Sequence, residues 1–152
     1  MHKLPILLVL MLASRVEARE LPSEIDLRAA YCISIVQGSI SVVRSVPIDA
    51  RFTEEIKEIV EETLSEMTAD LRKLQLYLIP RIPHLAPLGL VAAHKSGEED
   101  FVRFDKYVKT CQTKCEHLLN KPSWASCLEK CKTDNPLNTH LKACSDLSWL
   151  PF

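Results

Sequence analysis

The chain has 152 residues and a nearly balanced charge, with 19 Lys and Arg against 20 Asp and Glu. This length suits one domain with a modest hydrophobic core. The near-neutral charge gives no general argument for binding nucleic acid or an anionic membrane surface. With only three glycines in the chain, we expect no phosphate-binding glycine-rich loop.

The N-terminus has the features of a secretory signal peptide. A short basic start precedes an apolar run over residues 4–13, which is about half the length needed to cross a bilayer. Val16 and Ala18 are small residues at the −3 and −1 positions, so we expect cleavage between Ala18 and Arg19. An uncleaved anchor or a buried N-terminal helix is the alternative. Removal of the signal peptide would leave a single domain over residues 19–152.

The cysteines indicate the cellular compartment of the protein. All six lie after the expected cleavage site, and an even number in an exported chain is typical of disulfides. The later chain has no stretch that is long and apolar enough to span a membrane. We therefore expect a periplasmic or an extracellular protein, and the absence of an Asn-x-Ser/Thr sequon is compatible with the periplasm.

The first predicted helix covers about residues 24–46. Apolar residues recur there at steps of three and four, as on one face of a helix. Ser23 is placed to act as its N-cap, and Pro47 ends it.

The second predicted helix covers about residues 53–79 and has an uninterrupted apolar stripe. Its other face is acidic, because residues 54–70 contain seven Asp and Glu and one Lys. Such a run is usually a solvated face. The alternative is a docking surface for a basic partner or for the chain's own basic segment, residues 103–142.

Residues 80–97 contain three prolines and two glycines, which predicts an irregular crossover. His84 and His94 lie in this segment and could bind a metal. Because no cysteine or carboxylate lies at a ligand-like spacing beside them, we expect both to be surface residues without a metal.

Two Cys-x3-Cys pairs predict a helical hairpin over about residues 98–120 and 123–133. A four-residue spacing puts both sulfurs of a pair on one face of a helix. Antiparallel helices would then place Cys111 opposite Cys131 and Cys115 opposite Cys127, so that two disulfides join them.

A short last helix is predicted over about residues 136–147, after the cap signal Asn135-Pro136. Its Cys144 is left to pair with Cys32 in the first helix. The predicted fold is therefore an all-α bundle of four or five helices, with a C-terminal helical hairpin held by disulfides.

Catalytic motifs are absent from the sequence, and we expect a protein that is not an enzyme and has no cofactor. A nucleophilic Cys115 beside His117 is conceivable, but adjacent helical residues diverge. The four hairpin cysteines could bind zinc, although zinc sites more often use Cys-x2-Cys turns. Redox exchange is a further alternative, and it too is more typical of Cys-x2-Cys.

The twin Cys-x3-Cys pattern, Cys111/Cys115 and Cys127/Cys131, resembles two groups of proteins. One is the α-hairpinins, which are small antimicrobial and inhibitor peptides. The other is the small chaperones of the mitochondrial intermembrane space, which escort hydrophobic membrane proteins. The resemblance covers about twenty residues and implies the disulfide-joined hairpin, not the activity of either group.

Binding is the function that these features favour. Our first hypothesis is an exported protein that binds a protein partner in the cell envelope or outside the cell. The second is a carrier or chaperone that holds an apolar ligand or an unfolded client between its helices. An enzyme or redox protein is the third, and nucleic acid is not an expected partner.

Overall fold

The computed structural model describes residues 19–45, 54–118, 123–135 and 137–151. The predicted signal peptide and Ala18 lie outside these residues. In the described part, five α-helices and two short 3₁₀ helices occur and no strand, so the predicted all-α fold is confirmed. The elements are α2 (Glu24–Ser45), α3 (Glu54–Leu78), η1 (Ile82–His84), α4 (Pro87–Cys115), η2 (Glu116–Leu118), α5 (Ser123–Thr133) and α6 (Leu137–Lys142).

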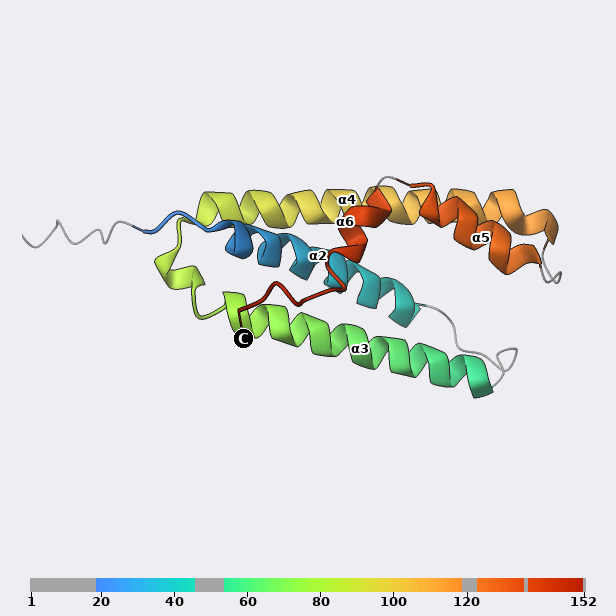
Figure 1. Cartoon of the computed structure of the whole chain (residues 1–152), viewed down its shortest axis with the longest axis horizontal. Helices are drawn as coiled ribbons and strands as arrows, with labels where there is room; N and C mark the ends of the chain where they lie inside the picture. Colours follow the sequence, from blue (N-terminus) through green and yellow to red (C-terminus); the bar gives the residue numbers. More distant parts are fainter. Residues whose placement is uncertain (1–18, 46–53, 119–122, 136, 152) are drawn as a thin grey trace, which may run out of the picture.

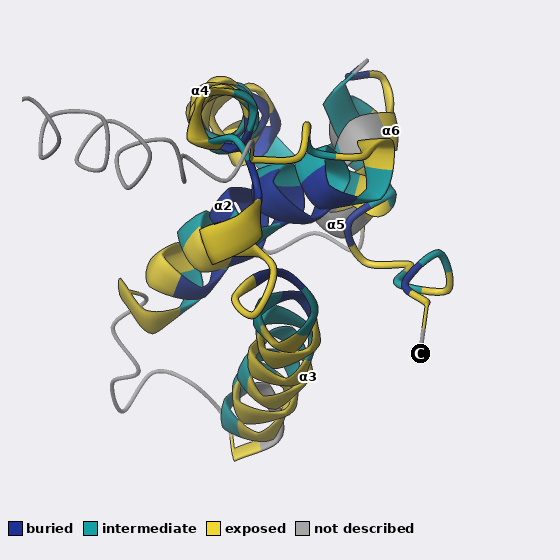
Figure 2. Ribbon diagram, turned by 90° about the vertical axis from the view of Figure 1, so that its left-hand side faces the viewer, coloured by how far each residue is buried: buried dark blue, intermediate teal, exposed yellow. Residues whose placement is uncertain are grey.

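Helix α2 is the centre of the molecule. It lies between α3 and α4, while α5 runs back along the outer end of α4 and α6 returns to α2 (Figure 1). The buried positions concentrate on α2 (Figure 2). Between Ala29 and Val36 they occur on nearly all sides of the helix, as expected for a helix with neighbours on several sides.

The crossing of α2 and α4 is close because it uses glycine. A Cβ atom at Gly97 would lie 2.5 Å from the carbonyl oxygen of Tyr31 and would overlap Ser34 Oγ. Three residues further along α4, the Asp100 carboxylate accepts a hydrogen bond from the Tyr31 hydroxyl at 3.0 Å. Burial and this bond raise the pKa of Tyr31 to about 12, so its hydroxyl remains a donor at neutral pH.

The prediction for the start of the third helix was wrong. Helix α4 begins at Pro87, where we expected an irregular crossover over residues 80–97 and a helix from about residue 98. Proline fits the first turn of a helix because its missing N–H would have no partner there. Gly97 lies inside the helix and does not mark a turn. Its role is to permit the close contact with α2, which requires a residue without a side chain.

The three disulfides join the pairs that the sequence predicts. Cys111–Cys131 and Cys115–Cys127 connect α4 to α5, and Cys32–Cys144 connects α2 to the segment after α6. All six cysteines are bonded, which leaves no free thiolate for the zinc alternative in this state. Cys111 and Cys115 are fully buried, so the sulfur atoms are part of the hairpin core.

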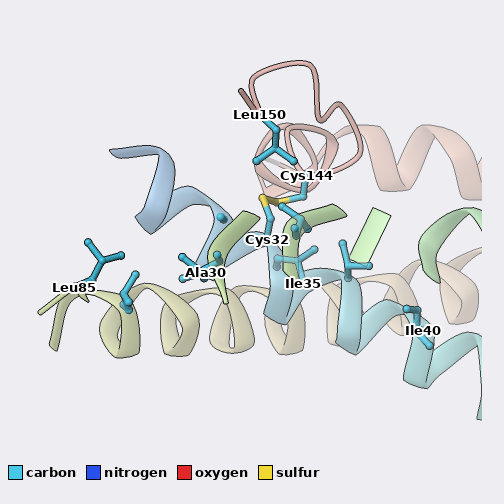
Figure 3. Close-up of a cluster of buried hydrophobic side chains, with 12 residues drawn as sticks. Ala30, Cys32, Ile35, Ile40, Leu85, Cys144 and Leu150 are labelled. Atoms are coloured by element: carbon cyan, nitrogen blue, oxygen red, sulfur yellow. A yellow bond between two sulfur atoms is a disulfide. The ribbon is translucent and has the colours of Figure 1, made fainter. Parts of the chain in front are cut away.

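The last helix is shorter than predicted, because α6 ends at Lys142 and not near residue 147. The next carbonyl group, that of Ala143, accepts a hydrogen bond from Arg28 Nη2 at 3.0 Å. The Arg28 guanidinium also lies 4.4 Å from the centre of the Trp149 ring. Leu150 belongs to the same buried cluster as the Cys32–Cys144 disulfide (Figure 3), so the C-terminal segment packs back on α2.

The acidic half of α3 forms no described ion pair with the basic hairpin. Within the described residues, the ion pairs of this half are local: Lys57 with Glu54 at 2.5 Å and Lys73 with Asp70 at 3.1 Å. The described side chains of this half are exposed or half-buried, so it is mainly a solvated face. In the described part of the chain, no helix combines the length and the apolar character that a membrane span requires.

Candidate binding groove

A groove runs between the C-terminal half of α3, η1 and the N-terminal half of α4, with α2 as its floor. Its volume is about 570 Å³. The apolar lining residues are Ala30, Ile33, Leu78, Ile79, Ile82, Pro87, Leu90 and Val91. The polar ones are Gln75, His94, Lys95 and Glu98.

The walls of the groove expose large apolar side chains. Leu78 and Leu90 are buried at its base, whereas Ile79 is 57% exposed and Val91 is 64% exposed. Leu88, one helical turn before Val91 on α4, is 84% exposed just outside the groove. Apolar side chains that cluster on the surface of a soluble protein commonly mark an interaction site.

The groove is polarised along its length, as the order of residues on the helices shows. On α4, Pro87 is next to η1, Val91 follows one turn later, and Glu98 is two turns further on. Helix α3 approaches η1 from the opposite direction, and of its lining residues Gln75 is the one farthest from η1, one turn before Ile79. The lining beside η1 is therefore apolar, and the polar lining residues of α4 lie two to three turns beyond Pro87.

The polar end contains charges of both signs. His94 Nδ1 lies 3.6 Å from Glu98 Oε1, and Lys95 Nζ lies 3.9 Å from Glu99 Oε1. Both distances exceed the 2.7–3.2 Å of an N–H···O hydrogen bond, so these pairs are loose. The side chains of Lys95 and Glu98 are 72% and 59% exposed, and both can turn toward a bound molecule.

A buried carboxylate fixes the apolar end of the groove. Asp26, at the start of α2, is fully buried and accepts hydrogen bonds from Arg81 Nε at 2.7 Å and the Tyr77 hydroxyl at 3.0 Å. Ser23 donates to the same carboxylate through its N–H and its hydroxyl, and its Oγ accepts from the Asp26 N–H as the predicted N-cap. Because Arg81 directly precedes Ile82, this network holds η1 against α2.

The network depends on the ionised form of Asp26. Burial of this carboxyl raises its pKa, but the hydrogen bonds from Arg81, Ser23 and Tyr77 outweigh that effect and hold the pKa well below its usual range. Burial and the bond to Asp26 raise the pKa of Tyr77, which keeps its hydroxyl protonated as a donor. The carboxylate is therefore charged at neutral pH.

The backbone before α2 also supports this end. The Glu20 N–H donates to the His84 carbonyl at 2.9 Å, and the Ala86 N–H donates to the Glu20 carbonyl at 2.8 Å. These bonds tie the segment after η1 to the chain that leads into α2.

A second cavity is smaller, at about 280 Å³, and lies among α2, α3, α4 and α6. Phe101, Phe104 and Met67 line it, and Cys144 forms part of its wall. Its volume is near the lower limit of roughly 300 Å³ for ligand sites. The groove is the stronger candidate.

The residues singled out in the sequence are distributed as follows. His84 is exposed at η1, and His117 is exposed beside the Lys114 carbonyl. His94 lies at the polar end of the groove, a position that the wrong start of α4 concealed. Arg19 is exposed. Among the described residues, no group of three His, Cys, Asp or Glu could hold a metal ion.

Comparisons with protein-family models, with curated proteins and with solved structures found no match to the chain.

Proposed function

We propose that the chain is an exported, non-enzymatic binding protein and that its groove takes an apolar ligand. The groove carries this proposal, because about 570 Å³ lies within the range of roughly 300–1,000 Å³ that small-molecule sites occupy. Such sites are mainly apolar and have a few polar groups that orient the ligand, and this groove has that character. The three disulfides suit an oxidising compartment.

A solvatochromic apolar dye tests the proposal, with two variants of one residue type on one helix. Val91 lines the groove and Val102 lies outside it, and each is 64% exposed. Aspartate at either position should change the stability little, because surface substitutions are usually within about 0.5 kcal/mol. We expect V91D to weaken dye binding at least tenfold and V102D to leave it within twofold.

Displacement of the dye identifies the type of ligand. A fatty acid should displace it from the wild-type protein. Dye that fails to bind saturably, or that binds V91D and V102D equally well, would exclude the groove as the site.

A protein partner is the second candidate, favoured by the exposed Leu21, Leu76 and Leu88 near the same end of the molecule. In the same assay, displacement by reduced, unfolded α-lactalbumin but not by a fatty acid would favour this candidate.

The export proposal is tested by the intact mass of the protein recovered from expressing cells. The mass should correspond to a chain that begins at Arg19, lowered by two hydrogens for each of the three disulfides. A mass that retains residues 1–18, or thiols that alkylate under native conditions, would contradict it.

A further inference from the structure

We infer that the ligand of the groove is a single-chain amphiphile with a zwitterionic head group. This inference rests on the proposed function and specifies the class of ligand. Its alkyl chain would lie toward η1, and its head group would lie at the end formed by His94, Lys95 and Glu98.

The dimensions of the groove suit one alkyl chain of medium length. From Pro87 to Glu98 the lining residues of α4 span eleven steps along the helix, which is about 16 Å at a rise of 1.5 Å per residue. The end at η1 is formed by Ile79, Ile82 and Pro87, and none of these side chains offers a polar group. A terminal methyl group fits this end, whereas a second polar group there would lose its hydration without gaining a partner.

The polar end favours a head group that carries both charges. Lys95 and Glu98 are three residues apart on α4 and are therefore neighbours on one face. A purely anionic head near Lys95 would also meet the carboxylates of Glu98 and Glu99, and a purely cationic head near Glu98 would meet Lys95. A head with an ammonium group and an anionic group can pair each charge with its opposite.

The current partners of these side chains do not prevent such pairing. The distances of 3.6 Å from His94 to Glu98 and 3.9 Å from Lys95 to Glu99 are too long for hydrogen bonds. Replacement of these contacts by contacts with a ligand therefore costs little interaction energy. Gln75 is the polar lining residue on the α3 wall, and its amide can donate or accept a hydrogen bond along the groove.

Three probes with the same dodecyl chain test the inference in the dye-displacement assay, below their micelle concentrations. They are dodecylphosphocholine (zwitterionic), laurate (anionic) and dodecyltrimethylammonium (cationic). We expect the zwitterion to bind about two- to fivefold more tightly than either singly charged probe. This ratio corresponds to the free energy that one exposed ion pair typically contributes.

Charge-removing variants assign the preference to residues. K95M and E98Q should each weaken the binding of dodecylphosphocholine about two- to fivefold. They should also reduce the ratio of its affinity to that of the other two probes. K106M and E116Q remove the same charges from exposed sites outside the groove and should leave all three affinities within error.

The outcomes separate the inference from the proposed function. Equal displacement by the three probes, or tighter binding of either singly charged probe, would overturn the zwitterionic head group, while the groove would stand as an apolar ligand site. If none of the probes displaces the dye, both the inference and the apolar-ligand proposal fail. An equal effect of K95M and K106M would also reject the assignment of the head group to this end.

Discussion

Substitution of Gly97 by alanine tests the close packing of α2 on α4. The added methyl group would lie 2.5 Å from the Tyr31 carbonyl oxygen and would overlap Ser34 Oγ. The hydroxyl of Ser34 can rotate, but it would lose its 2.7 Å hydrogen bond to that same carbonyl. The carbonyl belongs to the backbone of α2, so it can move only if the helix moves.

The expected magnitude is the balance of one stabilising and two destabilising effects. Alanine in place of glycine inside a helix stabilises it by about 1 kcal/mol. Extra volume in a well-packed contact costs typically 1–3 kcal/mol, and loss of the Ser34 bond adds about 1 kcal/mol. We therefore expect G97A to lower the free energy of unfolding by about 1–3 kcal/mol.

Urea unfolding followed by circular dichroism, with the disulfides intact, measures this change. G89A is the matched control, because it lies on the same helix and a Cβ there would lie 3.3 Å from Leu27 Cδ2 and 3.4 Å from Pro22 Cγ. Leu27 Cδ2 is the end of a flexible side chain, and both contacts are longer than those at Gly97, so G89A should change the free energy of unfolding by no more than about 1 kcal/mol. A G97A protein that is at least as stable as the wild type would refute the packing argument.

Three further predictions concern the buried carboxylate and the disulfides. D26N should lower the free energy of unfolding by about 1.5–3 kcal/mol, the range for hydrogen bonds to a charged group, as measured by urea unfolding; an unchanged midpoint would contradict the role of the network. Because the folded-state pKa of Asp26 is below its unfolded value, the wild type should gain stability from this carboxylate above about pH 4 and lose it as the pH falls; D26N should show a smaller loss between about pH 5 and pH 2. Removal of Cys32–Cys144 by alanine at both positions should cost about 4–5 kcal/mol, against about 3 kcal/mol for Cys115–Cys127, because the chain segments closed are 112 and 12 residues; equal losses would show that loop length does not govern the difference.

The sequence predicts the first two helices and the two hairpin disulfides well, because both follow from local spacing. The Cys32–Cys144 pair followed only by elimination. The step of four between Cys111 and Cys115 is one helical turn, and the structure buries both residues against α5. The first two helices likewise agree with their apolar stripes to within one residue at each end. These features need no knowledge of distant contacts.

The groove and the Asp26 network were not predicted, because each depends on residues that are distant in the sequence. Asp26 reads as an ordinary acidic residue in the first turn of a helix, and only the folded chain brings Arg81 to it. The prolines and glycines of residues 80–97 are typical of a loop, and this composition concealed the first three turns of α4. His94, Lys95 and Val91 therefore could not be assigned to one helical face.

The span of each disulfide has a consequence for the order in which the oxidised chain is assembled. The hairpin cysteines are separated by 20 and 12 residues, so their encounter requires closure of only a short chain segment. The partner of Cys32 lies 112 residues later in the chain, and the two cysteines can meet only when α6 packs beside α2. The hairpin disulfides can thus form before the rest of the bundle has folded. Cys32–Cys144 can form only after the whole bundle has assembled.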